Sequence, residues 1–201
     1  MLRAASHRLP LALLLAPLAA CASHGVGAVS GNLVQLYDQA SPDGVIELEI
    51  DRKGIIREME ADVSVTTLPI AVRDAALKEA RGARIVGAER EIAQGWNGWE
   101  VKLEWQGRDM ELVYDDEVNL RQKEVQLLRS EAPGAVLIGA DQAIPGGEFL
   151  GVERVETGRE LEFHVKKLLN GASYKIVLEE DGSLIRKVRE ARAELEIPLV
   201  D

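Results

Sequence analysis

Few side chains in this sequence have the types and spacing that catalysis requires. His164 is the only histidine in residues 45–201, and it lies on a segment that alternates like a strand. A histidine on such a segment is more often a solvated surface residue than a general base. The sequence has no G-x-S-x-G elbow, no H-E-x-x-H pair, no Walker loop and no Rossmann glycine pattern. It therefore predicts no catalytic residue, no cofactor and no enzymatic activity.

Two acidic segments are the strongest candidates for metal ligands. Asp115-Asp116-Glu117 and Glu179-Glu180-Asp181 both follow segments that alternate like strands. A calcium ion takes six to eight oxygen ligands, but neither segment has the D-x-D-x-D-G spacing of a calcium loop. Because aspartate favours turn geometry, both segments are predicted to be solvated hairpin turns. The sequence thus predicts no metal site, and a calcium-binding or hydrolytic protein is a less favoured alternative.

Cys21 is the single cysteine, and it directly follows an apolar segment. Arg3 and Arg8 precede the uncharged residues 9–20, which is the arrangement of an export signal. The apolar part is too short to cross roughly 30 Å of hydrocarbon as a helix, so we expect it to be cleaved. Leu18-Ala19-Ala20-Cys21 resembles a bacterial lipobox, in which the cysteine is acylated before the cut.

The alternative is an ordinary export signal that is cut near Ala20 or Ala22, with Cys21 incidental. The lipoprotein interpretation is favoured because no second cysteine is present for an intrachain disulfide. It makes residues 1–20 a lipoprotein signal peptide and residues 21–44 a flexible tether, whose first part is rich in Gly, Ser and Ala. Because no Asp follows the cysteine, the outer membrane, facing the periplasm, is the favoured site of the lipid anchor.

The charge of the chain limits its partners. It contains 24 Lys and Arg against 34 Asp and Glu, which gives a formal net charge of −10. Nucleic-acid binding requires a basic patch, so the composition argues against it. An acidic body is also repelled by an anionic membrane surface, so we expect membrane contact through the lipid anchor alone.

An internal repeat organises most of the remaining chain. A shift of 64 residues places residues 69–123 over residues 133–187 without a gap. Matching positions include prolines, glycines, valines and lysines: Pro69 and Pro133, Gly82 and Gly146, Val101 and Val165, Lys102 and Lys166. One register held over this length predicts a duplication. We therefore divide the chain into a partial repeat hairpin over 45–68, a first unit over 69–132 and a second over 133–201.

Each unit begins with a helix and continues with strands. Apolar residues recur at helical spacing after each proline, and Gly82 and Gly146 are placed to end the two helices. The segment 99–105 then alternates strictly between apolar and charged residues, as a half-buried strand does. The predicted fold class is α+β: tandem repeats of one helix plus a three- to four-stranded antiparallel sheet, with the helices packed on one sheet face. Val101 and Val165 should be equivalent core positions.

These motifs resemble a known family. The helix entered by "LP" at 68–69, the strand "WEVKL" at 99–103 and the "ELVYD" hairpin at 111–115 are similar to the PepSY-like, or beta-lactamase-inhibitor-like, group. The resemblance implies an exported or membrane-anchored bacterial protein with a protein-binding or inhibitory role. The turn "PGA" of that group is replaced here by "RGA" at 81–83 and "PGG" at 145–147.

The polar sheet faces are the predicted binding surface. Glu100 and Glu104 alternate with Lys102 in one unit, and such mixed charges favour orientation and selectivity in a protein contact. An aromatic residue in a turn, at "GWNG", could add an anchor. The candidate binding residues are Trp96, Lys102, His164 and Lys166. The alternative is that helices cover these faces or that the sheet curls around them.

The sequence therefore predicts a non-enzymatic cell-envelope lipoprotein that binds or inhibits a protein or peptide partner. The alternative is a structural or sensing envelope lipoprotein without a tight soluble ligand.

Overall fold

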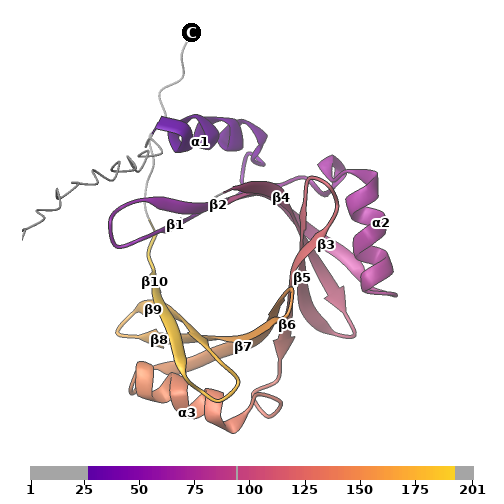
Figure 1. Ribbon diagram of the computed structural model, residues 1–201. Helices are drawn as coiled ribbons and strands as arrows, with labels where there is room; N and C mark the ends of the chain where they lie inside the picture. The colour runs from indigo at the N-terminus through magenta and orange to yellow at the C-terminus, as the bar shows by residue number, and fades with distance from the viewer. Residues whose placement is uncertain (1–26, 94, 193–201) are drawn as a thin grey trace, which may run out of the picture.

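One curved antiparallel sheet dominates the structure (Figure 1). The computed structural model describes residues 27–93 and 95–192. In this part of the chain the strands are β1 (Ile46–Ile50), β2 (Ile56–Val63), β3 (Arg84–Ala93), β4 (Trp96–Trp105), β5 (Arg108–Asp115), β6 (Leu120–Leu127), β7 (Glu148–Thr157), β8 (Glu160–Leu169), β9 (Ala172–Leu178) and β10 (Leu184–Glu190). The helices are α1 (Gly27–Gln39), α2 (Ile70–Glu79) and α3 (Gly134–Ala143), with a 3₁₀ turn η1 (Val65–Thr67) before α2.

Every strand pairs with the next strand along the chain, in the order β1 to β10. The sheet curls until its first and last strands face each other, and the three helices lie outside the curve (Figure 1). One ion pair joins the two ends of the sheet, between Arg186 Nη1 on β10 and Glu49 Oε1 on β1, at 2.7 Å. The sheet therefore has a convex outer face that carries the helices and a concave inner face.

The apolar side chains of the strands pack against the helices on the outer face. Under α2, Val72 and Ala76 lie in one buried cluster with Val101 of β4. Under α3, the corresponding cluster contains Val136, Ala140 and Val165 of β8. Val101 and Val165 are both fully buried. The expected core positions are therefore confirmed, and burying such apolar surface is the main stabilising term of the fold.

The expected fold class is wrong in one essential respect. We predicted tandem repeats of a helix plus a separate three- to four-stranded sheet, but β6 pairs with β7 and β2 pairs with β3, so the strands form a single sheet. The physical reason is that a separate small sheet would leave the backbone N–H and C=O groups of its edge strands unpaired. Alternation along one strand shows which side is apolar, but it does not show which strand lies across its edge.

Part of the segment expected to be a flexible tether is helical. Residues 27–39 form α1, and Leu36 is fully buried against Met59 and Ala61 of β2. This third small cluster lies on the same outer face as the clusters under α2 and α3 (Figure 1).

Two further sequence predictions concern turns and membrane segments. Gly82 and Gly146 have φ of +83° and +72°, but the prediction that they end the helices is wrong: the C-caps are Ala80 and Ile144, and each glycine lies two residues later in a turn. Among the described residues, the helices are all too short or too polar to cross a bilayer. The predicted signal peptide and Cys21 lie outside the described residues, as do residues 193–201.

Candidate functional site

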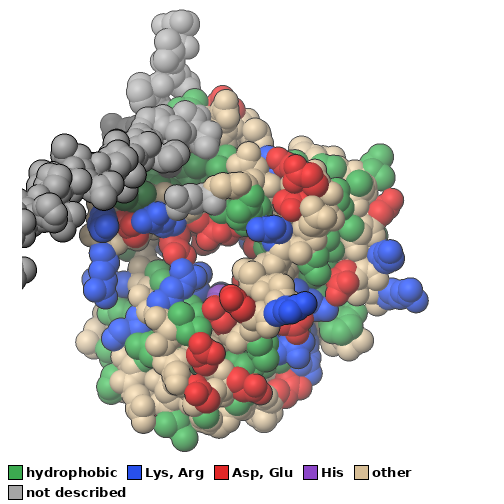
Figure 2. All heavy atoms as spheres, in the orientation of Figure 1, with side chains coloured by type: hydrophobic (Ala, Val, Ile, Leu, Met, Phe, Trp, Pro, Cys, Tyr) green, Lys and Arg blue, Asp and Glu red, His purple; other side chains and the backbone are tan. Residues whose placement is uncertain are grey.

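The concave face is built from the side chains that point away from the helices. Residues opposite each other in an antiparallel pair share a face, so the strand registers place the polar residues in rows across the curve. These rows are Glu47–Glu60–Glu91, Glu89–Glu100, Lys102–Glu111–Glu124 and Glu153–His164–Val177–Arg186. Acidic and basic side chains gather around the hollow that the sheet encloses (Figure 2). The predicted binding residues Lys102, His164 and Lys166 all belong to this face.

Strands β1 to β5 make the concave face acidic. Glu91 is only 3% exposed, and Glu89 and Glu100 are also buried. Burial, reinforced by repulsion from neighbouring glutamates, raises the pKa of Glu60 to about 8 and that of Glu91 to about 10. The same causes raise the pKa of Glu100 well above its usual value. These carboxyls therefore lie in surroundings that favour a proton or a bound cation.

Lys102 extends from β4 into this acidic region. Its Nζ contacts Glu89, lies 3.8 Å from Asp62 Oδ1 and 4.0 Å from Glu100 Oε1. Burial alone would lower the pKa of Lys102, but the hydrogen bond and attraction from Glu89, together with Glu100, raise it above its usual value. Lys102 is therefore a charged side chain that is held by acidic neighbours, with about a third of its side chain exposed.

Strands β7 to β10 give the concave face a mixed character. His164 is 6% exposed, so the expectation of a solvated surface histidine is wrong. Burial, together with the positive charges of Lys175, Arg186 and Lys166, lowers its pKa to about 3, so its imidazole is neutral at physiological pH. Lys166 Nζ pairs with Glu153 Oε1 at 3.1 Å. The histidine is buried because it lies on the concave face, which the curved sheet encloses; on an isolated strand the same face would be exposed to solvent.

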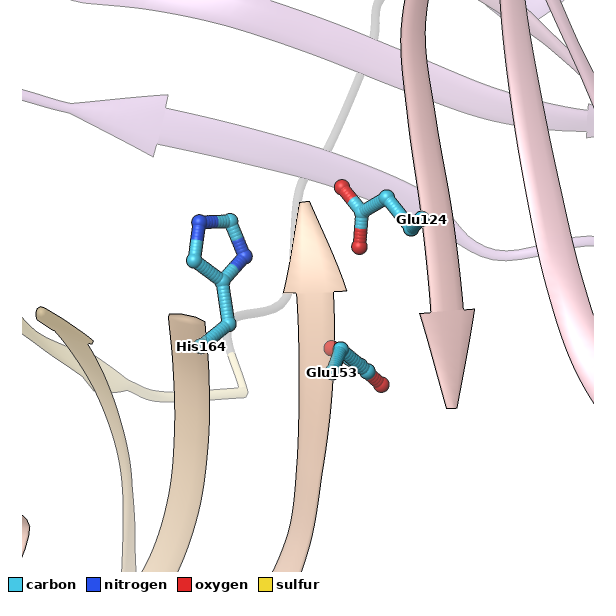
Figure 3. Close-up of side chains that lie close together, drawn as sticks. All are labelled: Glu124, Glu153 and His164. Atoms are coloured by element: carbon cyan, nitrogen blue, oxygen red, sulfur yellow. The ribbon is translucent and has the colours of Figure 1, made fainter. Parts of the chain in front are cut away.

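The structure brings together two groups of side chains that the sequence analysis did not single out. Glu124, Glu153 and His164 place one candidate ligand atom each within 4.8 Å of the others, and Figure 3 shows them on β6, β7 and β8. Glu58, Glu60 and Glu91 form the second group on β2 and β3. Strand alternation places each residue on the polar face, but only the register between strands shows that they meet.

Trp96 is not in a turn, as the sequence suggested, but begins strand β4. Its side chain is half-buried, and the guanidinium carbon of Arg121 lies 5.6 Å from the centre of its ring. Such a distance is within the range of a cation–π contact. Its role as a binding anchor stays a prediction.

The two acidic turns use their carboxylates within the fold. Asp115 accepts hydrogen bonds from the backbone N and Nδ2 of Asn119, and Asp116 pairs with Arg90 at 2.6 Å. In the second turn, Asp181 accepts a hydrogen bond from the backbone N of Ser183 at 2.8 Å. The prediction of solvated hairpin turns is met at 116–117 and 180–181, but it is wrong for Asp115, which is buried and ends β5.

Comparison with known proteins gives a likeness of fold. No protein-family model matches this chain, and no curated protein matches it. A crystal structure of a DUF2874 family protein from Bacteroides uniformis is similar with a TM-score of 0.51 at 19% identity, over 61% of this chain and 89% of that one. A protein from Bacteroides eggerthii, provisionally assigned to the periplasm, gives a TM-score of 0.51 at 16% identity, over 60% of this chain and 88% of that one.

A BLIP-like protein from Bacteroides fragilis is similar with a TM-score of 0.49 at 22% identity, over 66% of this chain and 96% of that one. These identities establish similarity of fold and nothing finer. The two likenesses with a TM-score of 0.51, to the DUF2874 family protein and to the Bacteroides eggerthii protein, concern the fold alone. Membership of the PepSY-like family stays a prediction.

Proposed function

We propose that this chain is a non-catalytic binding protein of the bacterial cell envelope, and that its concave face holds a positively charged segment of a protein or peptide. The observation that carries the proposal is the group of buried carboxylates on β1 to β5. Glu60, Glu91 and Glu100 have pKa values raised by burial and by neighbouring glutamates, so in the empty face they hold protons more tightly than free glutamates do. A cationic ligand would favour ionisation of these carboxyls and pair with the carboxylates that form.

The contacts of Lys102 support this reading. Its ammonium group meets Asp62, Glu89 and Glu100 from three different strands, which is how a lysine or arginine from a partner could be received. Complementary charges of this kind speed association and select partners more than they add affinity. The mixed charges of β7 to β10, with Lys166 and Arg186, would fix which way a charged peptide runs across the face.

The cellular location rests on other observations. An export signal is predicted over residues 1–20, and one protein of similar fold is provisionally assigned to the periplasm. These observations support our proposal that the protein is exported to the periplasm; its anchoring to the outer membrane by acylated Cys21 is the further part of the proposal. The Cys21→Ser variant should lose fatty-acid labelling and move to the soluble fraction. If the parent takes up no label, the anchor is wrong, while the binding proposal is unaffected.

Binding can be tested with defined peptides. Fluorescently labelled decalysine should raise its anisotropy when titrated with the purified protein, and labelled decaglutamate should not. The double variant Glu60→Gln with Glu91→Gln should weaken decalysine binding about five-fold or more, since glutamine cannot lose a proton to form the carboxylate that pairs with a lysine. The affinity should also fall with added salt, because exposed charges are screened.

A matched control changes the same number of charges elsewhere. Asp74 on α2 and Glu180 in the β9–β10 turn are exposed and lie off the concave face, so Asp74→Asn with Glu180→Gln should leave decalysine binding unchanged. Equal weakening by both double variants would show a nonspecific effect of net charge and overturn the proposal. If decalysine binding depends on Glu60 and Glu91 and not on the control residues, capture from periplasmic extract followed by mass spectrometry would identify the natural partner of the concave face.

The rival function is a structural or sensing lipoprotein without a tight soluble ligand. It predicts that neither peptide binds and that the extract yields no partner that depends on Glu60 and Glu91.

A further inference from the structure

Three neighbouring strands direct potential metal ligands to one point of the concave face. Glu124 comes from β6, Glu153 from β7 and His164 from β8, and their candidate ligand atoms lie within 4.8 Å of one another (Figure 3). Glu153 on β7 and His164 on β8 are direct cross-strand partners. Glu124 on β6 is diagonal to Glu153, two residues from Gln126, the direct partner of Glu153. The rigid ladder of a sheet thus fixes the spacing of all three backbones.

The imidazole of His164 gives an independent indication of a ligand. The residue is 6% exposed, yet neither of its ring nitrogens has a hydrogen-bond partner among the described residues, and Nε2 is fully buried. Nε2 lies 3.6 Å from Glu162 Oε2, which is too long for a hydrogen bond. Figure 3 shows the other ring nitrogen on the side of Glu124 and Glu153. This nitrogen, Nδ1, is therefore the candidate ligand atom. Nε2 faces Glu162, a carboxylate of the kind that accepts the remaining N–H of a metal-bound imidazole.

We propose that Glu124, Glu153 and His164 bind a divalent transition-metal ion of the Zn²⁺ type, with water completing the coordination. Imidazole and carboxylate together suit Zn²⁺ and its first-row neighbours, whereas Ca²⁺ and Mg²⁺ take oxygen ligands. Three protein ligands leave one position of a tetrahedral site open. The all-carboxylate group Glu58, Glu60 and Glu91 has no nitrogen ligand and serves as the natural comparison.

The surrounding contacts hold the two glutamates while leaving oxygens available. Gln122 Nε2 donates a hydrogen bond to Glu124 Oε1 at 2.6 Å, and Lys166 Nζ pairs with Glu153 Oε1 at 3.1 Å. In each case the second carboxylate oxygen has no hydrogen-bond partner among the described residues. The uncharged amide of Gln122 orients a ligand without opposing a cation, whereas Lys166 holds Glu153 in place but competes with the ion for it.

Two features oppose binding and set its strength. Lys166, Lys175 and Arg186 place positive charges near His164, while Glu111 and Glu162 offset them. Ligand atoms around Zn²⁺ lie about 2.0–2.1 Å from the ion, so the side chains must rotate inward from their present spacing. The ligands lie on flexible glutamate side chains and on fixed strands, so this rotation does not require the sheet to move.

A metal ion at this position would join β6 to β7 and β8. The β6–β7 ladder is the junction between the strands that follow α2 and the strands that follow α3. Binding to the folded state alone would therefore stabilise this junction and raise the midpoint of thermal unfolding.

The test is a calorimetric titration of the EDTA-treated full-length protein with ZnCl₂, with Co²⁺ absorption as a second readout. We expect one saturable site, visible Co²⁺ bands of a low-coordinate complex, and a higher thermal midpoint with Zn²⁺. His164→Gln should raise the dissociation constant at least about ten-fold and remove the Co²⁺ bands. Glu124→Gln provides a second ligand variant, so a folding defect in one of the two does not decide the result.

Two controls separate this site from other sources of binding. Glu91→Gln, in the all-carboxylate group, and His24→Gln, in the N-terminal segment, should each leave the dissociation constant within about two-fold of the parent. The proposal is overturned if no saturable binding occurs, if His164→Gln and Glu124→Gln both bind like the parent, or if either control weakens binding as much as His164→Gln. Loss of decalysine binding would not affect these outcomes, because the two sites use different residues.

Discussion

The strands that follow α2 and those that follow α3 have the same order, but the first set makes the concave face acidic and the second gives it mixed charge. Both segments pack a buried valine, Val101 or Val165, under their own helix. On the concave face, however, buried Glu100 of β4 stands where buried His164 stands on β8, at the same distance along the repeated pattern. Likewise, Glu111 on β5 corresponds to Lys175 on β9.

This contrast shows that packing against helices restricts the residues of the outer face, whereas the residues of the concave face are free of that restriction. The outer face must match a helix, and close packing of apolar side chains leaves little freedom there. None of the helices in the described part of the chain packs on the concave face, so substitutions there can change the sign of its charge without changing the fold. Function is therefore expected to vary on the concave face, where the acidic and mixed regions meet near β6.

The same substitution in either of the two buried clusters, under α2 or under α3, should lower the free energy of unfolding by a similar amount. Replacing either Val101 or Val165 with serine removes a fully buried apolar side chain and introduces a hydroxyl without a partner. Each change should lower the free energy of unfolding by about 3 kcal/mol. Urea denaturation of the two variants measures this directly. A cost confined to one of them would show that the two cores are not equivalent.

The helices should respond differently, because α3 approaches its sheet more closely than α2. A Cβ on Gly139 would overlap the carbonyl oxygen of Gly182 and come within 2.9 Å of Leu178 Cδ2. Gly139→Ala should therefore destabilise the protein by about 2 kcal/mol, as overpacking does. The corresponding residue of α2 is Ala75, and Ala75→Gly should cost about 1 kcal/mol, mostly through helix propensity, with a small part from the loss of its partly buried methyl group. Thermal unfolding of both variants checks the difference, and a stabilising Gly139→Ala would contradict the close approach.

Much of the outer face could be predicted from the sequence. Alternation over 99–105 identified the apolar side of β4, and the left-handed backbone of Gly82 and Gly146 agrees with their glycine identity, although they lie two residues beyond the helix caps. These features depend on neighbours along the chain, whose spacing is visible in the sequence.

The concave face could be predicted only in part. Lys102 and His164 were assigned to the polar side of their strands, but the burial of His164 depends on the curvature of the whole sheet. The meeting of Glu124 with Glu153 depends on the β6–β7 register, which joins two segments that the sequence treated as separate. Charges such as these are common on any exposed strand, so no local pattern distinguished them.

The acidic region should make stability depend on pH. Glu60 has a pKa of about 8 in the folded protein against a usual value of 4.5, so the folded state binds the proton more tightly. This contribution to stability is fully present below pH 4.5 and is lost as the pH rises through 8. Glu60→Gln keeps the neutral form at every pH. It should match the parent near pH 4.5 and exceed it by about 1–2 kcal/mol at pH 9.

Urea denaturation across this pH range is the measurement, and Asp74→Asn on the exposed side of α2 is the control. If the difference in the free energy of unfolding between Glu60→Gln and the parent does not grow with pH, ionisation of Glu60 does not destabilise the folded protein.

The smallest effect is expected where the two contrasting regions meet at the ends of the sheet. Arg186 of β10 pairs with Glu49 of β1 at 2.7 Å, and the two side chains are 46% and 26% exposed. Exposed ion pairs contribute about 0.2–1 kcal/mol, so Arg186→Gln should lower the free energy of unfolding by no more than about 0.5 kcal/mol. A double-mutant cycle with Glu49→Gln, at low and high salt, isolates the coupling, which added salt should reduce. A coupling of about 2 kcal/mol or more would mean that this ion pair holds the two ends of the sheet together. The small coupling that we expect would mean that continuous strand pairing from β1 to β10 sets the curvature of the sheet. The ion pair would then only align two ends that strand pairing has already brought together.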